Sequence, residues 1–206
     1  MYWYHWISLA SLGICLVLSI VHLIRMLRLG RPKEYSAPAG RIAPAVRYSF
    51  TGAMSPAKKE TAFLHMPTYF AGIAYHLGTF LAILLFSLYW TGIAFPVIPR
   101  IAMALFLLGT SGCGVGILMK RLLKKGLRAL SNPDDYISNI LVTLFQLITA
   151  LVLLWDNAYP VYFILTSLLL LYFPAGKLKH AIYFFAARYH LGFFFGWRGV
   201  WPPKQA

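Results

Sequence analysis

Two histidines, His65 and His76, lie eleven residues apart in the apolar stretch LHMPTYFAGIAYHLGTF, residues 64–80. An ionisable side chain inside a membrane-spanning helix is costly unless it has a partner, so it marks a functional candidate. At about 100° per residue, eleven steps place two helical residues about 20° apart around the axis and about 16 Å apart along it. The spacing therefore predicts two imidazoles on one face of a helix.

Neutral imidazole is a standard axial ligand for haem iron, and ligation removes the cost of a charged ring in lipid. Gly72 lies one turn before His76 and Gly78 follows it, and small residues there would let a flat macrocycle approach the backbone. We therefore predict His65 and His76 as haem axial ligands, with Gly72 and Gly78 in close haem contact. The alternative is that the histidines hydrogen-bond to a neighbouring helix and the glycines serve helix packing.

A haem held between two helices needs ligands from a second helix, and the last apolar part of the chain carries His180 and His190. Lys177 and Lys179, next to His180, are placed to contact haem propionates. Basic residues that flank a span are equally well explained as topology signals. His190 follows His180 by ten residues, about 80° around an ideal helix, so the two share a face poorly.

The rest of the sequence predicts that membrane helices position these histidines. Of the 206 residues, 60% are hydrophobic and 12% are charged, and the mean hydropathy is +0.68. A soluble domain of this size does not bury so much apolar surface. We expect an all-α integral membrane protein, a bundle of five transmembrane helices forming a single domain over residues 1–206, because each apolar run approaches the roughly 20 residues of a span. The runs cover about residues 6–28, 67–91, 97–119, 136–155 and 159–176.

The lysines and arginines predict the orientation of these spans. All 19 of them except Arg100 lie at or beyond the inner ends of the first, third and fifth runs. By the positive-inside rule the N-terminus is outside and the C-terminus cytoplasmic. The loop over residues 29–64 and the cytoplasmic or interfacial tail over residues 177–206 then lie on the inner side.

Two of the connecting segments carry helix signals. The stretch SPAKKETAFLH, residues 55–65, predicts a short helix because serine is favoured as an N-cap and proline in the first helical position. Ser131 or Asn132 is expected to cap the fourth run. The acidic side chains of Asp134 and Asp135 would complement the positive end of that helix dipole.

The fifth run has two possible continuations. After LLLLYFPAGKLKH the chain becomes apolar again over residues 181–197. Either the fifth helix runs on past the membrane edge, or Pro174 and Gly176 kink it and an interfacial segment follows.

These features together resemble the membrane cytochrome b family of the respiratory nitrate reductase gamma subunit, which includes related membrane subunits of sulfite-reduction-associated and heterodisulfide-reductase-type complexes. The resemblance spans most of the chain and rests on FLHMPTYFAGIAYHLGTF, MKRLLKKGLRALSNPDDY and LLLLYFPAGKLKH, in that order. It implies five spans in a prokaryotic cytoplasmic (inner) membrane, with one or two b haems between the second and fifth helices. It also implies electron transfer between the quinone/quinol pool and an iron–sulfur partner subunit on the cytoplasmic side.

The resemblance can be carried over residue by residue. His65 and His76 match the family's pair on the second helix, and His180 matches its inner ligand on the fifth. The family's outer ligand on the fifth helix lies eighteen residues earlier, where this chain has Tyr162. One open arrangement is a single haem, with either His65 or His76 opposite His180. In the other, the fifth helix runs on, so that His76 pairs with His180, and His65 with His190.

Other classes of function are less well supported. The formal net charge of +14 lies between the apolar runs, so we expect membrane lipid and no nucleic acid as a partner. Cys15 and Cys113 form no cluster motif, so the only predicted metal is iron held through the haem ligands. We expect the quinone-reactive cytochrome b subunit of a multi-subunit oxidoreductase, without a complete catalytic site for the final substrate. The alternative is a haem-free membrane anchor subunit or a small non-redox membrane protein.

Overall fold

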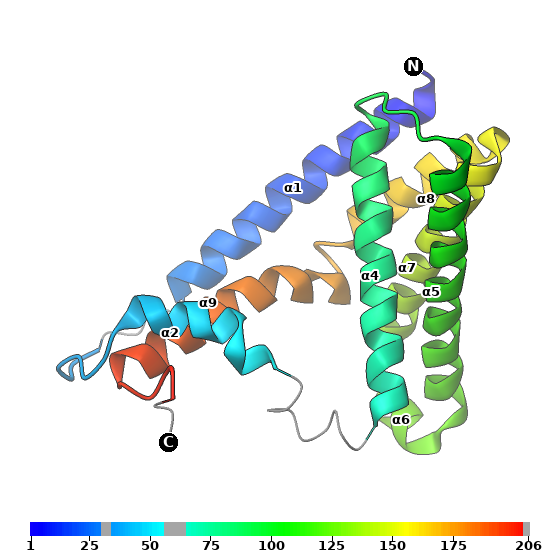
Figure 1. Cartoon of the computed structure of the whole chain (residues 1–206). Helices are drawn as coiled ribbons and strands as arrows, with labels where there is room; N and C mark the ends of the chain where they lie inside the picture. Colours follow the sequence, from blue (N-terminus) through cyan, green and yellow to red (C-terminus); the bar gives the residue numbers. More distant parts are fainter. Residues whose placement is uncertain (30–33, 56–64, 204–206) are drawn as a thin grey trace. The chain divides into compact units, whose positions relative to one another are not determined.

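The computed structural model describes residues 1–29, 34–55 and 65–203, and in these ranges the chain forms helices and connecting turns without a strand (Figure 1). Four helices are long and apolar enough to cross a membrane. They are α1 (Trp3–Leu29), α4 (Met66–Tyr89), α5 (Val97–Leu123) and α7 (Pro133–Leu154). A fifth crossing is present if the broken helical pair that follows α7 counts as one span. The predicted all-α class is confirmed, and the four helices overlap the first four predicted runs.

The remaining helical segments are shorter. They are α2 (Ile42–Phe50), η1 (Gly52–Met54), α6 (Lys125–Ala129), η3 (Asp156–Ala158), α8 (Tyr159–Tyr172), η4 (Lys177–Lys179) and α9 (His180–Trp197). The chain divides into two compact units. The first unit contains Met1–Cys15 and Met66–Leu178, and the second contains Leu16–His65 and Lys179–Ala206.

The first unit has an apolar core between α4, α5, α7 and α8. Small residues on three of these helices, Ala82, Ala104 and Ala150, are fully buried and let the helices approach closely. Larger core side chains surround them: Leu85, Phe86, Leu107, Val142, Phe145, Tyr162, Phe163 and Leu169. The outward faces of the same helices also carry many exposed Leu, Ile, Val and Phe side chains. Helices that are apolar on both faces suit a lipid environment better than water.

The start of α7 is fixed by a capping box. The backbone N–H of Asp135 donates to Oδ1 of Asn132 at 3.0 Å, and the backbone N–H of Asn132 donates to Oδ2 of Asp135 at 3.0 Å. Pro133 occupies the first turn, where its missing N–H costs nothing. Of the two predicted caps, Asn132 is therefore the one used.

A break separates α8 from α9. Helix α8 ends at Tyr172, and the N–H of Gly176 donates to the carbonyl of Tyr172 at 2.8 Å. A side chain at Gly176 would overlap the Tyr172 ring, and Pro174 has no N–H to continue the helical ladder. Residues 181–197 therefore belong to a separate helix that begins at His180. One of the predicted haem arrangements, with two haems, required a fifth helix that runs on without a break. The helix is interrupted between α8 and α9, so that arrangement loses its geometric basis.

In the second unit, α2 and α9 lie side by side (Figure 1). Glycines on α9 allow the contact, because a Cβ at Gly192 would lie 2.5 Å from the Cα of Val46. The hydroxyl of Ser49 on α2 reaches the carbonyl of Arg188 on α9 at 2.7 Å. Helix α2 lies in the predicted loop at a place where no helix was expected. The short helix predicted over residues 55–65 falls almost entirely on residues 56–64, which lie outside the described residues.

Candidate functional site

His76 lies on the exposed side of α4, in the first unit. Its Nδ1 is 2.7 Å from the carbonyl oxygen of Gly72, one turn earlier. Because a carbonyl only accepts, Nδ1 must carry the proton, which leaves Nε2 of the neutral ring with a free lone pair. Metal-ligating histidines are commonly oriented by such a hydrogen bond from the non-ligating nitrogen. His76 therefore has the tautomer and the exposure of an axial ligand through Nε2.

His65 lies immediately before the first residue of α4 and is exposed. Pro67 follows in the first turn of the helix, so His65 stands outside the regular helical turns. The predicted common face of His65 and His76 required the helix to extend back to residue 65. Ligation by His65 stays a prediction.

His180 and His190 both lie on α9, in the second unit. His180 is the first residue of the helix and is exposed. His190 is half-buried, and its Nε2 lies 3.3 Å from the carbonyl of Met26 on α1. That contact occupies the nitrogen that an axial ligand most often uses. His76 and α9 belong to different units, so pairing of His76 with His180 or His190 stays a prediction. Pairing of His65 with either of them also stays a prediction.

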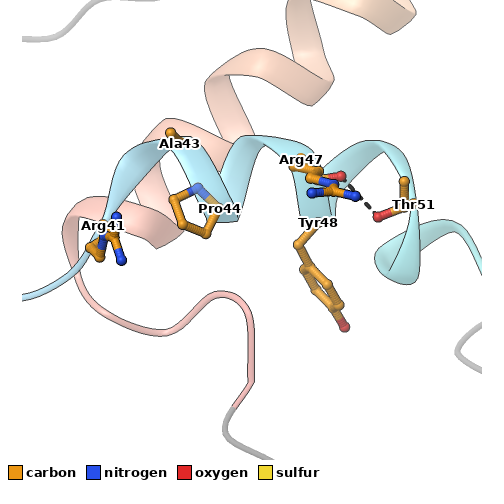
Figure 2. Close-up of a pocket in the computed structure, with 6 residues that line it drawn as sticks. All are labelled: Arg41, Ala43, Pro44, Arg47, Tyr48 and Thr51. Atoms are coloured by element: carbon orange, nitrogen blue, oxygen red, sulfur yellow. Dashed lines mark hydrogen bonds between the residues drawn. The ribbon is translucent and has the colours of Figure 1, made fainter.

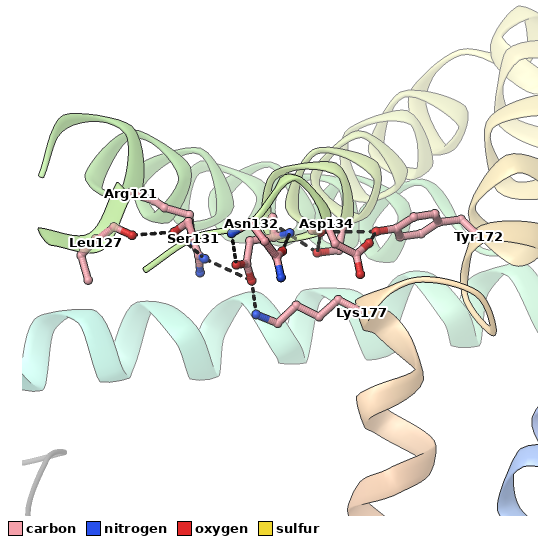
Figure 3. Close-up of polar contacts among 9 residues, drawn as sticks. Arg121, Leu127, Ser131, Asn132, Asp134, Tyr172 and Lys177 are labelled. Atoms are coloured by element: carbon pink, nitrogen blue, oxygen red, sulfur yellow. Dashed lines mark hydrogen bonds and ion pairs between the residues drawn. The ribbon is translucent and has the colours of Figure 1, made fainter. Parts of the chain in front are cut away.

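Lys177, predicted to contact a haem propionate, is engaged in a salt bridge in the first unit. Its ammonium group bonds to the carboxylate of Asp135, which Arg121 also approaches at 3.2 Å. The Asp135 side chain is only 5% exposed, so both cations compensate a nearly buried charge. Nearby, the Tyr172 hydroxyl bonds to Asp134, so one contact from the end of α8 and one from η4 reach the start of α7 (Figure 3). The role predicted for Lys177 would compete with this salt bridge. Lys179 is half-buried.

Gly72 and Gly78, predicted to contact haem, have different surroundings on α4. A Cβ at Gly72 would meet nothing within 4 Å, so the helix surface beside His76 is open. A Cβ at Gly78 would lie 2.6 Å from Cβ of Thr110 and 2.7 Å from Oε1 of Gln146. Gly78 therefore faces α5 and α7 and serves helix packing, as the alternative in the sequence analysis anticipated. Haem contact by Gly72 stays a prediction.

A buried polar network at this helix contact was missed by the sequence analysis. Gln146 on α7 is fully buried. Its Nε2 donates to the Tyr75 carbonyl at 3.0 Å and to the Thr79 hydroxyl at 2.8 Å, and its Oε1 accepts from Thr110 at 2.8 Å. The network ties α4, α5 and α7 together. The signal that could have revealed it is the single glutamine in the apolar run LVTLFQLITALVLL.

Tyr162 stands where the resembled family has its outer ligand on the fifth helix. It is 2% exposed, and its ring centroid lies 6.2 Å from that of Phe145 and 6.3 Å from that of Phe86. The position is filled by core packing between α4, α7 and α8.

His5, near the N-terminus, has both ring nitrogens hydrogen-bonded. The N–H of Tyr2 donates to its Nδ1 at 2.9 Å, and its Nε2 lies 2.9 Å from the Tyr89 hydroxyl. The ring is 6% exposed and lies 4.6 Å from the ring of Phe163. His5 is therefore a satisfied packing residue rather than a ligand. The other histidine of α1, His22, is half-buried beside the ring of Tyr183.

Comparison of the chain with protein-family models, with curated proteins and with solved structures found no match. Among the described residues, no three His, Cys, Asp or Glu side chains are grouped to hold a metal ion. Haem iron takes only one or two ligands from the protein, so that finding bears on cluster and zinc sites rather than on haem. The family resemblance accordingly stays a prediction.

Proposed function

We propose that this chain is a five-span membrane cytochrome b with its N-terminus outside the membrane and its C-terminus in the cytoplasm. It transfers electrons between the quinone/quinol pool and an iron–sulfur subunit on the cytoplasmic side. The proposal is supported above all by His76. An imidazole on the exposed side of an apolar helix, with Nδ1 fixed by the Gly72 carbonyl, offers Nε2 to a ligand.

The residues present fit a b-type haem on the α4 side. The surface at Gly72 is open, so a flat macrocycle could approach the helix beside His76. His180 is the proposed second ligand, and His65 and His190 are the remaining candidates. Haem would supply one-electron redox chemistry, while the chain would supply the axial nitrogens and an apolar environment.

The decisive experiment is haem quantitation on protein purified from haem-replete cells. We expect a red protein with a reduced-minus-oxidised alpha band and one or two haems per polypeptide by pyridine haemochrome. His76→Ala and His180→Ala should each lower the haem content by at least half. His22→Ala is the matched control, because it removes an imidazole from a different apolar helix, and it should retain haem.

Two results would overturn the proposal. One is a colourless, well-folded protein, which would favour the haem-free anchor. The other is unchanged haem content in the His65, His76, His180 and His190 single alanine variants. Circular dichroism and gel-filtration profiles of each variant separate haem loss from unfolding.

A further inference from the structure

The exposed side of α2 in the second unit carries an open pocket of about 440 Å³. Figure 2 shows its lining side chains along this single helix: Arg41, Ala43, Pro44, Arg47, Tyr48 and Thr51. Residues four apart form rows on a helix surface, so Ala43, Arg47 and Thr51 make one row and Pro44 and Tyr48 its neighbour. Arg41, at the N-cap, completes the lining, so two arginines contribute to the pocket.

The pocket is electropositive. Arg41 and Arg47 are both exposed, and neither belongs to the ion pairs found among the described residues, which involve Arg121, Lys177 and Arg198. The first turn of α2 contains no acidic side chain, and Arg41 at the N-cap makes no side-chain capping bond. The positive end of the helix dipole therefore adds to the field of Arg41, whereas Arg47 lies in the last turn of the helix. Guanidinium groups are the side chains best suited to bind phosphate oxygens in pairs.

Exposed aromatic rings accompany this charge in the same unit. Phe50, the last residue of α2, has its ring centroid 6.1 Å from that of Phe184 and 6.3 Å from that of Phe185. Phe185 is 59% exposed and Phe184 is 37% exposed. The arginines belong to α2 and the exposed rings to α9, and these two helices pack side by side. Basic side chains and exposed aromatic rings are both typical of segments that lie at a membrane surface. An acidic protein surface would match the arginines but leave these rings in water.

We infer that Arg41 and Arg47 bind the phosphodiester of an anionic phospholipid at the cytoplasmic surface of the membrane. The two arginines pair with the phosphate oxygens, and Phe184 and Phe185 enter the acyl-chain boundary. The inference rests on the membrane location and orientation proposed above, but not on haem or on the electron-transfer role.

The test is selective retention of lipid by the full chain. The protein is reconstituted in nanodiscs of phosphatidylcholine and phosphatidylglycerol and extracted with mild detergent, and the retained lipids are measured by mass spectrometry. We expect phosphatidylglycerol to be enriched over its share of the nanodisc. The double variant Arg41→Gln/Arg47→Gln should lower that enrichment about fivefold or more, given the attraction of basic residues to anionic lipid.

Lys124→Gln/Lys125→Gln is the matched control. It removes the same charge from two exposed lysines of the first unit and should retain the enrichment. Arg41→Lys/Arg47→Lys keeps the charge without the bidentate geometry and should restore part of it. Equal enrichment in both glutamine variants, or no enrichment in the unaltered protein, would overturn the inference. An unaltered protein that lacks haem but retains phosphatidylglycerol would refute only the electron-transfer role.

Discussion

Two glycines on one helix allow the same substitution to be tested in opposite surroundings. In Gly78→Ala the new methyl group would lie 2.6 Å from Cβ of Thr110 and 2.7 Å from Oε1 of Gln146. Overpacking of this kind costs about 1–3 kcal/mol. The methyl group would also break the 2.8 Å hydrogen bond between Thr110 and Gln146, and an unsatisfied buried amide oxygen costs about 1–3 kcal/mol. Alanine regains about 1 kcal/mol of helix propensity. The net expectation is a loss of about 1–5 kcal/mol.

Gly72→Ala is the control for this prediction. Its methyl group would meet nothing within 4 Å, so only helix propensity changes and the protein should be unaffected or stabilised by up to about 1 kcal/mol. Both variants can be compared with the unaltered protein by denaturant-induced unfolding in mixed micelles, followed by far-UV circular dichroism. Equal stability of Gly72→Ala and Gly78→Ala would refute the packing of α4 against α5 and α7.

Two further predictions concern polar contacts in the first unit. Lys177→Gln should cost only about 1 kcal/mol, because the Lys177 side chain is 48% exposed and Asp135 keeps Arg121 at 3.2 Å. Adding Arg121→Gln should bring the loss to about 3–5 kcal/mol, since the nearly buried carboxylate then has neither cation. Thermal melts of the two single variants and the double variant measure these losses. A loss in the double variant equal to the sum of the two single losses would contradict this prediction. Tyr89→Phe should destabilise by about 1–3 kcal/mol, because it leaves Nε2 of the buried His5 without its partner at 2.9 Å. The double variant with His5→Phe should recover part of that loss in the same melts, and a larger loss would count against the hydrogen bond.

Local signals were enough to predict much of the helical architecture. Apolar runs of about 20 residues predicted the helices now seen as α1, α4, α5 and α7, because a helix satisfies all its backbone groups within one segment. The cap at Asn132 followed from the residue type and from the apolar run after it. The second unit was predicted less well. Helix α2 has only nine residues, and its stability depends on contacts with α9, which lies far away in the sequence.

At the candidate site too, some features were predicted from the local sequence and others depend on contacts between distant segments. Sequence alone indicated that His76 lies on an apolar helix one turn after Gly72, because both facts follow from helical periodicity. Its ring tautomer depends on a hydrogen bond that required coordinates. The two glycines looked equivalent in the sequence, and only the packed helices assigned Gly78 to a contact with α5 and α7.

The amino-acid order therefore determined the helical class, the length of the apolar helices and the residue types able to bind haem iron. These depend on interactions within one or two turns of chain. The tertiary structure decided that Lys177 pairs with Asp135, that His190 contacts the Met26 carbonyl, and that Gln146 joins three helices. Those outcomes depend on which side chains meet across distant segments. A pattern read along one helix does not contain that information.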